Sequence, residues 1–167
     1  MKTLINKIYT LILLITLTSC WNTNWSEKER KEFSEKCSKQ IYFNTGSICF
    51  TGFEFNEIRE VKAIEKNGLE ILDTILIKIE IQRDNHDKNY KRYWGQTDIE
   101  FNVNHSYEFI LGSDKPYILD NMEMIMWAQY TMGGEGWGCE MGNFTIDNEK
   151  FEHRGNICIT KRGFKFE

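Results

Sequence analysis

Proline is nearly absent from this chain, because Pro116 is its only proline, while aromatic residues make up 14% of the sequence. Disordered stalks are typically rich in proline and poor in aromatics, so this composition favours a folded domain. The sequence also lacks a basic run with interleaved aromatic side chains, and its formal charge is −4. A mildly acidic chain without such a run is not expected to bind nucleic acid.

Familiar catalytic and metal-binding patterns are missing as well. The chain has three histidines, His86, His105 and His153, and none of them forms H-x₃-H or H-E-x-x-H. No serine stands in G-x-S-x-G, and no two cysteines form a C-x₂-C pair. The polar stretch around Asp84 and Asp87 lacks the glycine and the distal glutamate of a calcium loop. We therefore expect a protein that is not an enzyme and that carries no metal or cofactor.

The clearest pattern lies in the first 20 residues. Lys2 and Lys7 precede an apolar stretch over 8–17, and no acidic residue occurs before Cys20. As a helix this stretch would measure about 15 Å, half of a hydrocarbon core about 30 Å thick. That length suits a signal peptide better than a transmembrane span. The stretch ends in Leu17-Thr18-Ser19-Cys20, which resembles the lipobox of bacterial lipoproteins.

The resemblance implies a signal peptide over 1–19 and a mature chain that begins at Cys20. In that family the cysteine carries a thioether-linked diacylglycerol and commonly a further acyl chain. Two or three chains anchor a protein stably where one does not. The expected location is the bacterial cell envelope, and Trp21, in place of an aspartate, favours the outer membrane. An ordinary signal peptide cut near Ser19 and an uncleaved anchor are the alternatives.

Four cysteines remain after the anchor: Cys37, Cys49, Cys139 and Cys158. An even number in an exported chain favours disulfides, although four cysteines allow three connectivities. We favour Cys37–Cys49 and Cys139–Cys158, because each pair closes a moderate loop worth about 3 kcal/mol in the chain-entropy model. A zinc site made by all four cysteines is the rival interpretation, weakened by the missing C-x₂-C spacing.

The mature chain reads as a spacer over 20–25 followed by one domain over 26–167. Ser26 and Glu29 fit a capping box and predict a helix over 26–39, with Phe33 and Cys37 on one face. Asn67-Gly68 predicts a type I′ hairpin between 58–66 and 69–82. In the second arm isoleucines at 75, 77, 79 and 81 alternate with other residues, as in a strand with one apolar face.

The rest of the chain reads as short strands with frequent turns. We expect a polar loop over 83–97, strands over 99–103 and 107–111 joined by a tight turn, and a turn over 112–116. A long strand, or alternatively a buried helix, covers 117–132. Strands at 144–146, 151 and 157–161 follow, with a turn at Asp147-Asn148 after the first of them. With no second helix, this pattern predicts a mainly β fold: a short N-terminal helix packed on an antiparallel β-sandwich or small barrel.

The most unusual local feature is the glycine-rich segment over 132–140. Four glycines in six residues allow a loop that displays Trp137 between Glu135 and Glu140. Indole rings stack on sugars or enter partner pockets, and carboxylates accept hydrogen bonds from hydroxyls, so these residues form the candidate binding loop. In the alternative interpretation the loop is structural and Trp137 folds back on the core.

Three functional hypotheses follow. The first is a lipid-anchored, non-enzymatic envelope module that binds a protein or a glycan. The second is an immunity or inhibitor protein that acts against an envelope-active toxin or a lysozyme. The third is a hydrolase whose site the sequence does not reveal. Residues 21–167 show no resemblance to a domain family.

Overall fold

A computed structural model describes residues 25–79, 91–112, 115–131, 134–152 and 156–165. These ranges do not include the predicted signal segment, Cys20, Ile81, His86 or His153. The described chain is mainly β with a short helix on its N-terminal side, which confirms the predicted fold class. Among the described residues, no helix combines the length and the apolar character needed to cross a membrane.

The N-terminal helix is α2, Glu27–Cys37. The Ser26 hydroxyl accepts a hydrogen bond from the Glu29 backbone N–H at 3.3 Å, and the Glu29 carboxylate accepts one from the Ser26 N–H at 2.8 Å. This reciprocal pair is the predicted capping box, and it fixes the start of the helix. Trp25 and Phe33 pack edge to face at 5.2 Å, so the entry to the helix is held by aromatic packing too.

Six antiparallel strands form the largest sheet, in the order β12-β11-β8-β7-β3-β4. Residues of β7 and of the first half of β3 alternate between buried and more exposed positions, as expected for a sheet with one face on the core. The strands are β3 (Glu60–Asn67), β4 (Glu70–Lys78), β7 (Ser106–Ile110), β8 (Tyr117–Asp120), β11 (Phe144–Ile146) and β12 (Glu149–Phe151).

The hairpin β3–β4 confirms the predicted strand pair, but its turn lies one residue later than expected. Asn67 pairs with Glu70, so Gly68 and Leu69 form the connection. Gly68 has φ +61°, whereas Asn67 is not among the residues with positive φ. Glycine at the first central position is typical of a type II′ turn rather than type I′. The alternation in β4 is confirmed, because Ile77 and Ile79 are buried.

The second sheet has the order β13-β2-β5, with β2 at Ser47–Thr51, β5 at Arg92–Gln96 and β13 at Cys158–Thr160. Its β13–β2 pair is parallel, whereas the other described ladders are antiparallel, as predicted. The predicted loop over 83–97 is also wrong for 92–96. Gly95 is buried there, and a β-carbon on it would lie 2.9 Å from the Ile77 side chain.

Two shorter elements were not expected, β1 (Tyr42–Phe43) and the one-turn helix α3 (Phe55–Ile58). β1 pairs with β6 (Phe101–Asn102), and the Phe43 and Phe101 rings stack at 5.3 Å. The predicted tight turn does join this segment to β7, with a hydrogen bond from the His105 N–H to the Asn102 carbonyl at 3.1 Å, but β6 pairs with β1. Burial of the two phenylalanines directs this segment to β1 instead.

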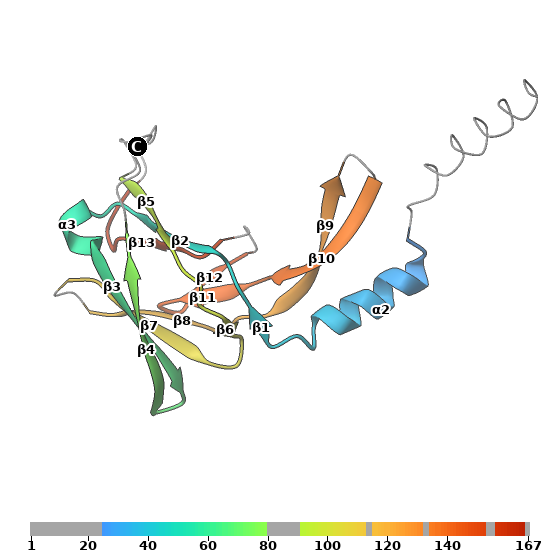
Figure 1. The fold of residues 1–167 in the computed structure, drawn as a ribbon, viewed down its shortest axis with the longest axis horizontal. Coiled ribbons are helices and arrows are strands. Elements are labelled where there is room, and N and C mark those ends of the chain that lie inside the picture. Colours follow the sequence, from blue (N-terminus) through green and yellow to red (C-terminus); the bar gives the residue numbers. More distant parts are fainter. Residues whose placement is uncertain (1–24, 80–90, 113–114, 132–133, 153–155, 166–167) are drawn as a thin grey trace, which may run out of the picture.

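The predicted single strand over 117–132 is divided in two. β8 ends at Asp120, Asn121 adopts φ +50°, and β9 (Met124–Thr131) pairs with β10 (Gly134–Met141). The alternative of a buried helix is wrong for this segment. The β9–β10 hairpin and α2 extend from the body of the domain, and we call these two elements the arm (Figure 1).

The two larger sheets share one hydrophobic core. Phe53 contacts both Phe50 of β2 and Tyr117 of β8 edge to face, at 6.4 and 5.9 Å, and so connects the sheets. Among the described residues, no sheet closes into a barrel. Of the predicted alternatives, packed sheets describe the body.

Both disulfides differ from the favoured pairing. The structure joins Cys37 to Cys139 and Cys49 to Cys158, with Cα–Cα distances of 5.1 and 4.2 Å. The predicted disulfides Cys37–Cys49 and Cys139–Cys158 are wrong because the tertiary fold decides the partners. Cys158 lies opposite Cys49 in the β13–β2 ladder, and α2 packs on β10. All four cysteines are paired, so the zinc site is wrong as well.

Candidate functional site

The predicted binding loop is a strand. Glu135, Trp137 and Glu140 all lie in β10, each opposite a residue of β9. Trp137 and Glu140 face opposite sides of the hairpin because their positions differ by an odd number of residues. The side chain of Glu135 lies outside the described part. The structure therefore does not bring Trp137 and Glu140 into one site.

Trp137 is packed against the helix of the arm. The Arg30 guanidinium of α2 lies 5.4 Å from the centre of the indole ring, a cation–π contact. The indole nitrogen is buried and makes no hydrogen bond to any described residue. Trp137 is half-buried rather than displayed, which corrects the expectation of an exposed stacking ring.

The exposed tryptophan of the arm is Trp127, on the opposite face of the hairpin. Its side chain is 46% exposed, and it lies across from Gly138. Gln129 folds over this glycine, since a β-carbon there would lie 2.4 Å from Gln129 Nε2. Gln129 Nε2 also donates to Glu140 Oε1 at 3.3 Å. The sequence analysis did not identify this face of the hairpin. The pattern that could have indicated it is the pairing of Trp127 with Gly138 and of Gln129 with Gly136.

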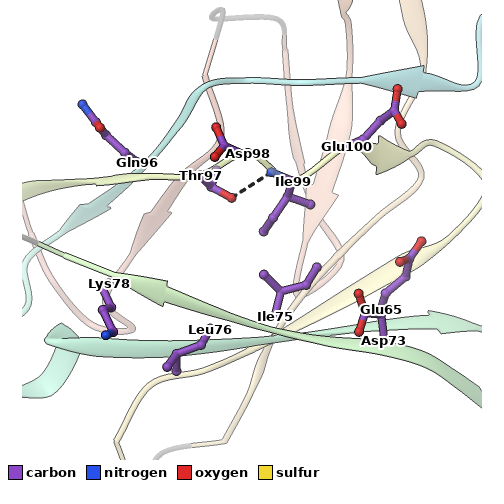
Figure 2. A pocket seen from close by; sticks show the side chains of 10 residues that line it. All are labelled: Glu65, Asp73, Ile75, Leu76, Lys78, Gln96, Thr97, Asp98, Ile99 and Glu100. Carbon is purple, nitrogen blue, oxygen red and sulfur yellow. Dashed lines mark hydrogen bonds between the residues drawn. The ribbon is translucent and has the colours of Figure 1, made fainter.

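A groove of about 640 Å³ lies on the body, within the usual size range of binding pockets. One wall is the β3–β4 hairpin, and the other is the extended segment that follows β5 (Figure 2). The lining residues are Glu65, Asp73, Ile75, Leu76, Lys78, Gln96, Thr97, Asp98, Ile99 and Glu100. We call this the acidic groove.

The acidic groove is an antiparallel ladder that has separated. Ile79 and Gly95 form an isolated antiparallel bridge. Continued in the same register, residues 96–100 would lie opposite 78–74, but no bridge joins these stretches. Residues 95–101 still alternate between buried and exposed positions, as an extended strand does. The groove is thus a wedge that is closed at the Ile79–Gly95 bridge and widens away from it.

The wedge combines an apolar centre with acidic sides. Ile75 and Ile99 point toward one another across it, while Leu76 and Lys78 turn to the other face of β4 (Figure 2). Glu65 and Asp73 form a cross-strand pair on the face that carries Ile75. Asp98 and Glu100 are exposed on the opposite wall. Four carboxylates therefore accompany one ammonium group, and the groove suits a cationic ligand.

Glu65 is held in position by two neighbours. Its Oε1 accepts hydrogen bonds from the Tyr107 hydroxyl at 2.9 Å and from His105 Nδ1 at 2.6 Å. The Tyr107 oxygen accepts in turn from the Asn102 backbone N–H at 2.8 Å. Burial raises the pKa of the Tyr107 phenol, so the hydroxyl remains protonated and able to donate. The network fixes one carboxylate of the groove in a single orientation.

The outer edge of β4 borders the groove. Among the described strands, β4 has a ladder only with β3, so its other edge is unpaired over Glu70–Lys78. Edge strands are usually protected by several lysines, prolines or bulges. β4 has one lysine, at its end, and an irregularity near the hairpin tip. Several large apolar side chains at this edge are exposed: Leu69, Ile71, Leu72 and Leu76.

The lining of the groove contains no serine, cysteine or histidine that could act as a nucleophile or as its base. Within the described ranges, no group of three potential metal ligands was found. Comparisons with protein-family models, with curated proteins and with solved structures returned no match.

Proposed function

We propose that this chain is a lipid-anchored protein of the bacterial envelope whose domain binds another protein without catalysing a reaction. The observation that carries the proposal is the unpaired edge of β4 beside the acidic groove. An edge that is unpaired among the described strands and that carries exposed apolar side chains is a ready surface for another chain. The rival hypothesis of a hydrolase would need two carboxylates of the groove as catalytic acid and nucleophile or base, and it remains an alternative.

The anchor is the part of the proposal that the sequence supports. Cys20→Ala removes the sulfur that would carry the diacylglycerol, so we expect complete loss of labelling by a clickable palmitate analogue. The protein should also move from the membrane fraction to the soluble fraction. Ser34→Ala is the control, because it changes an exposed residue outside the lipobox and leaves both disulfides intact. Labelling that persists in Cys20→Ala would contradict the anchor.

Protein binding can be tested by site-specific photo-crosslinking of the full chain in its own bacterium. A benzophenone amino acid is placed at Leu76 at the β4 edge, at Trp127 on the arm, or at Lys150 on β12. Leu76 and Lys150 are both exposed, but only Leu76 borders the groove. We expect a protein adduct from position 76 at a yield at least about tenfold above that from position 150. Equal yields at the two positions would contradict the proposal.

The Trp127 face supports a second candidate, a glycan-binding module. An exposed indole beside a carboxamide and a carboxylate can stack on a sugar ring and bind its hydroxyls. The same experiment separates the two functions. A polysaccharide adduct from position 127, without a protein adduct from position 76, would favour the glycan.

The hypothesis of an immunity or inhibitor protein is a narrower form of protein binding. The acidic groove favours it, because a carboxylate-rich surface complements a cationic toxin or lysozyme. Identification of the adduct from position 76 by mass spectrometry would decide this point.

A further inference from the structure

We infer that the acidic groove is completed by an extended, cationic segment of the partner, which adds to the edge of β4 as a further strand. This inference rests on the proposed function and names the chemistry of what is bound. Three features of the described residues carry it: the unpaired backbone of β4, the separated ladder opposite, and the distribution of charge.

The backbone of β4 supplies the first argument. In an antiparallel strand, alternate residues direct their N–H and C=O groups to opposite edges. Since β3 is the one strand that neighbours β4 within the described ranges, half of these β4 groups face away from β3. Register with β3 is regular from Glu60↔Lys78 to Glu65↔Asp73. These six residues of β4, 73–78, offer about 20 Å of edge.

The separated ladder supplies the second argument. The Ile79–Gly95 bridge holds the two walls together at one end, and beyond it residues 96–100 leave the β4 edge unpaired. A strand beside β4 would lie about 4.8 Å from it, between the walls of the wedge. Its apolar side chains would meet Ile75 and Ile99, which face one another there (Figure 2).

Charge decides the composition of the occupant. Asp98 and Glu100 alternate with Ile99 and point to the opposite face of their wall (Figure 2). Lysines or arginines that alternate with the apolar residues of an added strand would therefore meet these two carboxylates, while Glu65 and Asp73 border its apolar face. A second copy of this chain fits less well. Its own β4 carries Glu70, Asp73 and a single lysine, Lys78, so it cannot supply alternate cations to the groove.

The test uses a capped peptide of about eight alternating lysine and valine residues, which is long enough for the six-residue edge. Two matched peptides serve as controls, one with glutamate in place of lysine and one with N-methyl groups on all backbone amides, so that neither of its edges can donate a hydrogen bond. The N-methyl peptide keeps its charge and side chains but cannot form the ladder. Binding to the full chain is measured by fluorescence anisotropy at low and high salt.

We expect the lysine–valine peptide to bind at least about tenfold more tightly than either control, with affinity that falls as salt rises. Hydrogen exchange should slow for the amides of 73–78 when the peptide binds. Equal binding of the N-methyl peptide would show a charged surface without strand addition, and would overturn the inference. Absence of saturable binding would overturn it too.

Protein variants check the location. Asp73→Lys with Asp98→Lys changes one acid on each wall and should weaken peptide binding at least about tenfold. Glu35→Lys with Glu149→Lys changes the net charge equally, at exposed positions on α2 and β12, and should leave binding within about twofold. If the lysine variant fails to fold, Asp73→Asn with Asp98→Asn replaces it, because this variant removes the same two charges and keeps the shape of the side chains. An equal loss in the control pair would contradict the assignment.

The proposed function and the inference fail in different ways. If the adduct from position 76 forms but Asp73→Lys with Asp98→Lys does not reduce it, a protein binds by another mode and the inference is overturned alone. If no protein adduct forms at position 76, both the proposed function and the inference are overturned.

Discussion

Replacing Cys49 and Cys158 together with alanine should lower the free energy of unfolding by about 4–5 kcal/mol. The two cysteines are 109 residues apart, and closing a loop of about 100 residues is worth about 4.7 kcal/mol in the chain-entropy model. The bond also ties β13 to β2, a parallel pair that no short turn can connect. Urea unfolding followed by circular dichroism measures the loss.

The second disulfide provides the matched control. Cys37 and Cys139 are 102 residues apart, so the chain-entropy term is nearly the same. This bond fastens α2 to the β9–β10 hairpin rather than β13 to β2. Its double alanine variant should release α2 in hydrogen exchange while the amides of β2 and β7 stay protected. Loss of protection in β2 to the same degree in both variants would contradict this division.

Gly52→Ala should destabilise the fold by about 2–4 kcal/mol. Gly52 adopts φ +81°, which L-residues with a β-carbon rarely adopt. A β-carbon would also lie 2.4 Å from Cγ of the Phe164 ring, so the ring must move. Two costs therefore add, backbone strain and overpacking. The change in thermal midpoint and in the urea midpoint measures their sum.

A double-mutant cycle separates those two costs. Phe164→Ala removes the ring, so Gly52→Ala in that background should keep the backbone strain and lose the clash. The cost of Gly52→Ala should then fall to about half. Gly46→Ala is a useful reference, because Gly46 has φ +66° but no heavy atom lies within 4 Å of the position that its β-carbon would take. An unchanged cost of Gly52→Ala in the absence of the ring would contradict the role of Phe164.

Local signals in the sequence predicted local structure. The capping box at Ser26 placed α2, and the Asp147-Asn148 pair, with φ of 53° and 68°, forms the expected turn between β11 and β12. In such elements a few neighbouring residues fix the backbone, so the sequence alone suffices. The Asn67-Gly68 turn shows the limit, because the register of β3–β4 shifted it by one residue.

Long-range pairing could not be predicted in the same way. The parallel β2–β13 pair and the two disulfides join residues about a hundred positions apart, and sequence spacing favoured nearer partners. The acidic groove was missed for a related reason. The sequence predicts a strand that begins at Ile99, but the groove depends on where the ladder from Gly95 separates from β4. The glycine-rich composition indicated Trp137 as the exposed ring. In the structure α2 packs on the face of the hairpin that carries Trp137, and Trp127 on the other face is the exposed tryptophan.

The Cys37–Cys139 bond also determines how the domain would carry mechanical load. With Cys20 in the membrane as proposed, tension enters through the 17 residues from the anchor to Cys37 and reaches β10 directly through the bond. Strands β1 to β8 lie inside the covalent loop that this bond closes. A partner that pulls on β4 therefore loads two chain segments in parallel, the one from Cys37 to β4 and the one from β4 to Cys139. The single chain that carries the whole load, and can extend under it, runs only from the anchor to Cys37.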